Sequence, residues 1–286
     1  MPKKSSVHKD CAYKAISCCN GCINACLYCF ARGDAVQKGR MSIKDWQTPK
    51  VRWYDVDRIV RQRKKYDYPI MFPGTHDISY ENFDACVDVL GALLDAGNKV
   101  LLVSKPVHSI IKAICLLFPE HKDKINFRFT IGSTDDSLLK HWEPGAPGFE
   151  ERLESLKTAY ELGHVTSVSV EPMLDIDNSE ELLRVLSPYS TQAIWFGLMN
   201  HLYHFDTDLD QAKTEAGIRR VKRNRQFFGA KMARKVRKEG DRIRVQQTPN
   251  RILQMYNELK DHPSARFKSS IRRLIGVEEL SHSELW

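Results

Sequence analysis

The chain has 286 residues, of which 42% are hydrophobic and 28% charged, so it is too apolar for a disordered protein. Its apolar runs are far shorter than the roughly 18 residues of a membrane helix, and its first ten residues are polar. A net charge of +8 points to an anionic partner, and we expect a cytoplasmic protein without a membrane span.

Strands and helices alternate along the first 200 residues. Short apolar runs predict strands at 68–72, 100–103, 125–131, 165–170 and 193–198, with a sixth expected at 12–17. Apolar residues at helical spacing predict helices at 55–65, 80–96, 107–118, 149–162 and 179–186. The alternation predicts an α/β fold with a parallel sheet, either a partial (β/α)6 barrel or a doubly wound sheet.

The excess positive charge lies at the C-terminal end of the chain. Residues 201–286 hold 19 basic and 11 acidic side chains, whereas the first 200 residues hold 25 of each. We therefore predict a domain at 1–200 and a basic, mainly helical extension at 201–286 that packs on it, with a closing helix near residues 266–274. The basic side chains that we expect to contact nucleic acid are Arg219, Arg220, Lys222, Arg223, Arg225, Lys231 and Lys235.

Five of the eight cysteines fall within residues 18–29. In a cytoplasmic chain such a cluster indicates metal binding rather than disulfides. Cys19-x2-Cys22 with Cys26-x2-Cys29 would suit zinc, although zinc sites usually separate their ligand pairs by a dozen or more residues. Cys22-x3-Cys26-x2-Cys29 instead suits three irons of a [4Fe–4S] cluster and leaves one iron open.

The Cys-x3-Cys-x2-Cys spacing, with aromatic Tyr28 before the last cysteine, resembles the signature of radical S-adenosylmethionine (radical SAM) enzymes. The resemblance implies a partial (β/α)6 radical SAM barrel with a [4Fe–4S] cluster on Cys22, Cys26 and Cys29. It also implies reductive cleavage of S-adenosylmethionine to a 5′-deoxyadenosyl radical that abstracts hydrogen from a substrate. A flavodoxin- or ferredoxin-type protein would supply the electron.

Further segments resemble the spore photoproduct lyase branch of these enzymes: residues 126–130, 142–144, 149–153 and 169–172. The lyases carry a cysteine near the end of the second strand that returns a hydrogen atom to the repaired thymine. Residues 71–75 of this chain contain no cysteine, so the lineage is shared while the lyase reaction itself is doubtful. Cys18 and Cys19 are expected to be neighbours of the cluster without a role, with a radical relay or an auxiliary centre as the alternatives. Cys86 and Cys115 are expected to be buried small hydrophobic residues.

Polar residues at the ends of the expected strands have roles that this resemblance implies. They are Tyr28 beside adenine, Thr75 and Asp77 at the methionine amino group, Lys105 at its carboxylate, Thr130 and Ser133 at the ribose hydroxyls, and Glu171 at the ribose or substrate. Glu143 and Arg152 are expected to form a structural pair outside the site.

The sequence favours a radical enzyme that modifies or repairs DNA or RNA. A peptide or a small molecule is the alternative substrate for the same chemistry. A zinc-stabilised nucleic-acid-binding protein without chemistry is the alternative of a different class.

Overall fold

The computed structural model describes residues 14–199 and 247–277. Seven parallel strands form its main sheet, in the order β1-β4-β5-β6-β7-β8-β9. Their bounds are Lys14–Ala15, Ile70–Phe72, Val100–Ser104, Ile125–Thr130, Val165–Val170, Ile194–Phe196 and Ala265–Phe267. The six strands expected from the sequence are all present, although the first is shorter than predicted.

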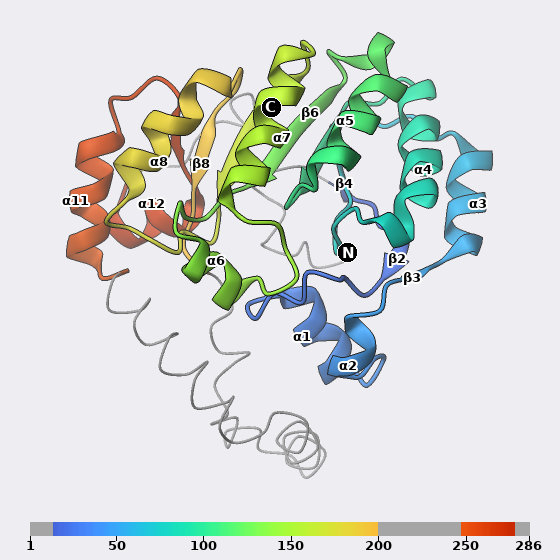
Figure 1. Cartoon of the computed structure of the whole chain (residues 1–286), viewed down its shortest axis with the longest axis horizontal. Helices are drawn as coiled ribbons and strands as arrows, with labels where there is room; N and C mark the ends of the chain where they lie inside the picture. The colour runs from blue at the N-terminus through green and yellow to red at the C-terminus, as the bar shows by residue number, and fades with distance from the viewer. Residues whose placement is uncertain (1–13, 200–246, 278–286) are drawn as a thin grey trace.

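The strand order distinguishes between the two expected architectures. A doubly wound sheet reverses its strand order at a switch point, whereas this order follows the chain from one edge to the other. Right-handed crossovers then place every connecting helix on the same face. Figure 1 shows these helices in an arc outside the strands. They are α3 (Trp53–Gln62), α4 (Phe83–Asp95), α5 (His108–Leu117), α7 (Phe149–Glu161), α8 (Ser179–Leu186) and α11 (Pro249–Leu259). The partial barrel is thereby confirmed, with seven strands rather than six.

The seventh strand corrects one expectation for the C-terminal extension. Residues 265–267 were expected at the start of a closing helix, but they form β9, which pairs with β8. The closing helix is α12, Ser269–Ile275. Three residues are too few to show the period of a strand, so only pairing with β8 identifies β9. The expected domain boundary at 200–201 and the seven residues expected to contact nucleic acid lie outside the described residues.

Short elements surround the cysteine cluster where no element was assigned from the sequence. Strands β2 (Cys19–Asn20) and β3 (Lys50–Val51) form an antiparallel pair. Helices α1 (Phe30–Gln37) and α2 (Ile43–Trp46) lie between them along the chain. Together with α6 (Asp136–Trp142), these helices lie at the lower end of the sheet in Figure 1, toward which β6 points. The 3₁₀ turns are Tyr80–Asn82, Pro119–His121 and Ser187–Tyr189.

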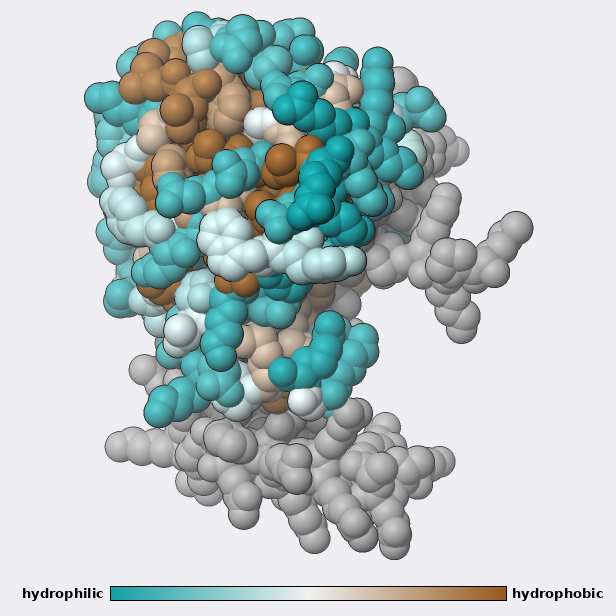
Figure 2. Space-filling view, turned by 90° about the vertical axis from the view of Figure 1, so that its right-hand side faces the viewer, coloured by the Kyte–Doolittle hydropathy of each residue, from teal (hydrophilic) through white to brown (hydrophobic). Residues whose placement is uncertain are grey.

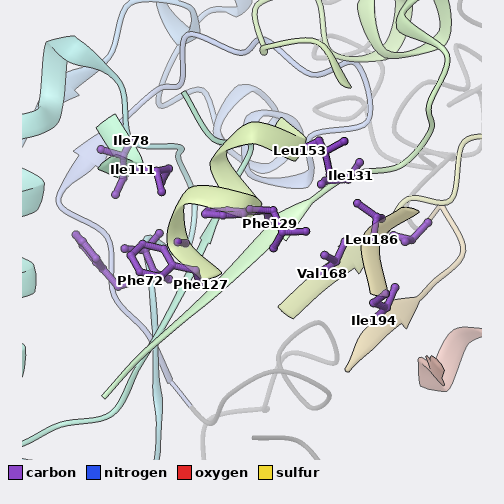
Figure 3. Close-up of a cluster of buried hydrophobic side chains, with 14 of the residues drawn as sticks. Phe72, Ile78, Ile111, Phe127, Phe129, Ile131, Leu153, Val168, Leu186 and Ile194 are labelled. Carbon is purple, nitrogen blue, oxygen red and sulfur yellow. The ribbon is translucent and has the colours of Figure 1, made fainter. Parts of the chain in front are cut away.

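The central strand β6 explains how the sheet separates its two faces. All six of its residues are buried, and successive side chains of a strand point to opposite faces. Phe127 and Phe129 join the hydrophobic core with side chains of neighbouring strands (Figure 3). Arg128 lies on the other face, where its Nε donates to Ser167 Oγ at 3.0 Å and its guanidinium lies 5.5 Å from the Trp195 ring. The interior of the barrel therefore holds polar as well as apolar side chains.

The outer surface is mainly hydrophilic on the side of α3. Figure 2 views this side and shows hydrophilic residues over much of the face, with hydrophobic residues visible between them. Among residues 14–199 and 247–277, no helix is both long and apolar enough to cross a membrane.

Candidate active site

The three motif cysteines lie on the loop between β2 and α1. Cys22 and Cys26 are 7% and 6% exposed, and Cys29 is partly buried. The loop is tied to two other segments, because Cys22 N–H donates to Trp46 O and Leu27 N–H to Trp142 O, both at 2.8 Å. Gly21 has φ +87°, and a Cβ there would lie 2.6 Å from Trp46 O, so only glycine fits.

Two further contacts hold this loop against the first helix. Cys29 is the N-cap of α1, and its Sγ accepts the Arg32 N–H at 3.4 Å. The buried Arg32 side chain turns back and donates to Ala25 O at 3.0 Å and to Leu27 O at 2.9 Å. Its guanidinium therefore holds the carbonyl groups of the loop and brings a positive charge close to the three thiols.

The environment of the thiols is suited to positively charged iron, because ionising them without a metal is unfavourable. Burial, the largest cause, raises the pKa of Cys22, and the neighbouring Asp77 and Cys26 raise it further. Burial also raises the pKa of Cys26, to about 12. Bound iron offsets this cost, because metal binding deprotonates its thiol ligands. Two buried thiols and one partly buried thiol on one loop can hold three of the four irons of a [4Fe–4S] cluster.

Asp77 connects the cysteine loop to the ends of β4 and β5. Its Oδ2 lies 3.7 Å from Cys22 Sγ and accepts from Asn24 Nδ2 at 2.8 Å. Its Oδ1 accepts from Ser104 Oγ at 3.0 Å and from Lys105 N–H at 2.7 Å. Burial raises the pKa of this carboxyl, but Lys105 and these hydrogen bonds outweigh it and hold the pKa below its usual value.

Lys105 and Tyr28 occupy the same buried region. Lys105 Nζ lies 4.0 Å from Asp77 Oδ2 and 5.6 Å from the centre of the Tyr28 ring. Burial lowers the pKa of Lys105, but Cys26, Asp77 and Glu143 together raise it above its usual value. Lys105 is thus a cation, only 12% exposed, among negative or potentially negative groups.

Glu143 belongs to this region as well as to the expected structural pair. Its Oε2 lies 2.5 Å from an Arg152 nitrogen, and both side chains are fully buried. The predicted pairing is confirmed. In addition, the Tyr28 hydroxyl donates to Glu143 Oε1, which links the pair to the residue expected beside adenine. Burial, followed by the Glu143 charge, raises the pKa of Tyr28.

The other expected cofactor-binding residues at strand ends, Thr130, Ser133 and Glu171, have different partners from those of Asp77 and Lys105. Thr130 is buried at the end of β6, and its carbonyl accepts from Arg152 Nη1 at 3.1 Å. Ser133 is also buried, and its Oγ accepts the Asp135 N–H at 2.9 Å. Glu171 follows β7, and its Oε2 lies 3.0 Å from Nζ of the buried Lys268, just after β9. Lys268 could not be found from the sequence, because β9 was not foreseen.

Thr75 is placed apart from Asp77, although only His76 separates them in the chain. Its side chain is exposed and donates to Ser17 Oγ at 2.9 Å. It lines a cavity of about 700 Å³ whose wall also includes Ser17, Phe30 and Trp46. Its expected role at the methionine amino group stays a prediction.

Comparison with known families then decides the class of the protein. The model of the radical SAM superfamily matches residues 16–188. The chain belongs to the radical SAM superfamily. Members of this superfamily use a [4Fe–4S] cluster and S-adenosylmethionine. The matched residues cover the whole cysteine loop, which excludes the zinc interpretation of the motif.

Individual relatives are more distant. Uncharacterized protein ORF301 of Acidianus two-tailed virus is 28% identical over 168 residues, which are 54% of this chain and 53% of that protein. The chain thus spans about half the length of this curated relative. A spore photoproduct lyase mutant with bound AdoMet and dinucleoside spore photoproduct is 16% identical, with a TM-score of 0.49 over 88% of this chain and 75% of that one. A second lyase mutant is 20% identical, with a TM-score of 0.44 over 68% and 57%.

Proposed function

We propose that this radical SAM enzyme acts on a nucleic acid, which it modifies or repairs after abstracting a hydrogen atom. The observation that carries the chemistry is the buried site in which Cys22, Asp77 and Lys105 meet at the ends of β4 and β5. The observation that carries the substrate is the charge of residues 201–286, which hold 19 basic and 11 acidic side chains.

Each residue of the site has a proposed task. Cys22, Cys26 and Cys29 hold the cluster, which when bound and reduced supplies the electron that cleaves S-adenosylmethionine. Lys105 binds the methionine carboxylate through its ammonium group. Asp77 Oδ1 already accepts two hydrogen bonds, whereas Oδ2 accepts one from Asn24 and keeps capacity for the methionine amino group.

The remaining groups orient the cofactor. Tyr28 offers its ring to the adenine, and Glu143 holds the tyrosine hydroxyl in place. Thr130, Ser133 and Glu171 are proposed to bond the ribose hydroxyls or the substrate from the ends of β6 and β7. Arg152 neutralises Glu143 inside the protein, so this side of the site is held by a buried ion pair.

The nucleic-acid substrate follows from electrostatics. Within residues 219–244, 12 side chains are basic and two are acidic. This concentration of positive charge is suited to binding the phosphates of a nucleic-acid backbone. Residues 71–75 contain no cysteine, so we do not propose the lyase reaction with its cysteine hydrogen donor. The sequence resemblance to that branch supports a nucleic acid, while the reaction on it differs.

The test uses the full chain, purified and reconstituted without oxygen. We expect 5′-deoxyadenosine to form when dithionite and S-adenosylmethionine are added, and to form faster with DNA duplex, single strands or transfer RNA. Flavodoxin or ferredoxin should replace dithionite as the donor. Chromatography of the nucleic acid should reveal a modified nucleoside whose amount depends on S-adenosylmethionine.

A matched pair of variants tests the tail. Replacing the seven basic residues expected to contact nucleic acid (Arg219, Arg220, Lys222, Arg223, Arg225, Lys231 and Lys235) by glutamine should weaken oligonucleotide binding. It should also flatten the salt dependence of binding, by about 0.9 in log–log slope per lost phosphate contact. Replacing Arg61 of α3 and Arg63 just after it, whose side chains are 79% and 63% exposed, should do neither. Stimulation by a peptide or a small molecule alone would disprove the nucleic-acid proposal and leave the radical chemistry intact.

A further inference from the structure

A second group of ligand-type side chains lies outside the cysteine motif. Cys18, His76 and Cys86 come from the loop after β1, the loop after β4 and helix α4, and all three are buried. Their ligand atoms all lie within 4.8 Å of one another. We call these three residues the thiol–imidazole cluster. Among the described residues, these are the three potential metal ligands whose ligand atoms lie close enough together to bind a single ion.

The imidazole in this cluster is oriented as in metal sites. His76 Nδ1 lies 3.1 Å from the Asp77 carbonyl oxygen, which can only accept, so Nδ1 carries the proton. The other nitrogen, Nε2, therefore presents a lone pair, which accepts the Cys18 N–H at 3.3 Å and would have to exchange this hydrogen bond for an ion; it lies 3.8 Å from Cys18 Sγ. Metal-ligating histidines are held by the same kind of bond from the second nitrogen to a carbonyl group.

The spacing of the ligand atoms suits a tetrahedral ion. Zinc–sulfur bonds of about 2.3 Å and zinc–nitrogen bonds of about 2.0–2.1 Å, at a tetrahedral angle, separate two sulfurs by about 3.8 Å and a sulfur from a nitrogen by about 3.6 Å. The observed separations are 3.7 Å for Cys18 Sγ to Cys86 Sγ and 3.8 Å for Cys18 Sγ to His76 Nε2. A small ion can thus bind here with little movement of the side chains.

We propose that Cys18, His76 and Cys86 bind one zinc ion in a site separate from the [4Fe–4S] cluster. Two thiolates and one imidazole are a donor set that zinc takes with a fourth position kept for a small ligand such as water. The ion links the ends of β1 and β4 to α4. It also fixes the position of His76, the residue before Asp77, and so helps to hold Asp77 in the active site. This proposal does not depend on the identity of the substrate.

The experiment counts metals in the full-length holoenzyme, grown with added zinc and purified without oxygen. We expect about four irons, as in a [4Fe–4S] cluster, and about one zinc per chain. X-ray absorption at the zinc edge should show two sulfur ligands and at least one nitrogen ligand. Cys86→Ser should lower zinc severalfold while iron stays near the wild-type count.

Cys115→Ser is the matched control, because Cys115 is a buried free cysteine on the neighbouring helix α5. It should keep both metals. The proposal is overturned if the wild type holds no more zinc than Cys86→Ser, or if the zinc edge shows only nitrogen and oxygen neighbours. In that case, the thiol–imidazole cluster is ordinary packing.

A further variant separates this test from that of the radical chemistry. Replacing Cys22, Cys26 and Cys29 together by serine should abolish iron and 5′-deoxyadenosine formation while zinc stays near one per chain. Loss of zinc along with iron, in a variant that keeps its circular dichroism spectrum, would place the zinc on the motif and contradict the proposal. The wild-type zinc spectrum remains decisive if a variant fails to fold.

Discussion

Asp77 Oδ2 lies 3.7 Å from Cys22 Sγ, although 55 residues separate them in the chain. Asp77 also donates its own N–H to the same sulfur at 3.4 Å. One residue at the end of β4 thus contacts a proposed cluster ligand with both its backbone and its side chain. Since the same carboxylate accepts the Lys105 N–H, the cysteine loop and the proposed carboxylate site are positioned by a single residue.

Asp77→Asn removes the charge at this position and keeps the size of the side chain. We expect S-adenosylmethionine affinity to fall roughly ten- to a hundredfold, because hydrogen bonds to charged groups contribute about 1.5–3 kcal/mol. Equilibrium dialysis with the reconstituted enzyme measures this, and iron per chain should stay the same. Asp57→Asn, on the exposed surface of α3, is the control. Unchanged affinity in the Asp77 variant would remove Asp77 from the site.

Arg32→Met removes the side chain that binds two carbonyl groups of the cysteine loop. Two buried acceptors lose their donor, so the free energy of unfolding should fall by about 1–3 kcal/mol for each. We also expect faster loss of iron to a chelator, because the loop is held less firmly. Urea unfolding and iron release curves measure the two effects, with exposed Arg61→Met as the control. Equal iron release in both variants would mean that Arg32 does not support the loop.

Glu143→Gln leaves the Arg152 guanidinium buried without a charged partner. Breaking a buried pair in this way costs about 3–5 kcal/mol, so the urea midpoint should fall strongly. Glu181→Gln is the matched control, because Glu181 lies 2.6 Å from Arg184 in an exposed pair and its loss should leave the midpoint unchanged. Similar midpoints for the two variants would show that the Glu143–Arg152 pair contributes little.

His164 gives the protein a stability that depends on pH. Burial, the largest cause, holds the pKa of His164 below its usual value of 6.5. The unfolded chain therefore binds this proton more readily, and the free energy of unfolding falls as the pH drops through 6.5. His164→Gln should remove this part of the slope. Urea unfolding at a series of pH values measures it, and equal slopes in the two proteins would contradict the expectation.

Much of the barrel follows from local patterns in the sequence. Strands β5, β6 and β7 are continuous apolar or alternating runs, and their positions were predicted to within one residue. Helices α5, α7 and α8 were found in the same way from their apolar spacing. The cysteine spacing alone indicated the family, because three thiols that share one cluster must lie close together in the chain.

Only the tertiary structure decided which side chains meet. Thr75 and Asp77 both follow β4, yet one contacts Ser17 and the other contacts Cys22. Glu143 reaches Tyr28 across 115 residues, and no local pattern encodes this approach. The thiol–imidazole cluster likewise joins three segments through the crossovers of the barrel. Periodicity along the chain thus determines the elements, whereas register and crossover geometry determine the contacts, because they depend on residues far apart in sequence.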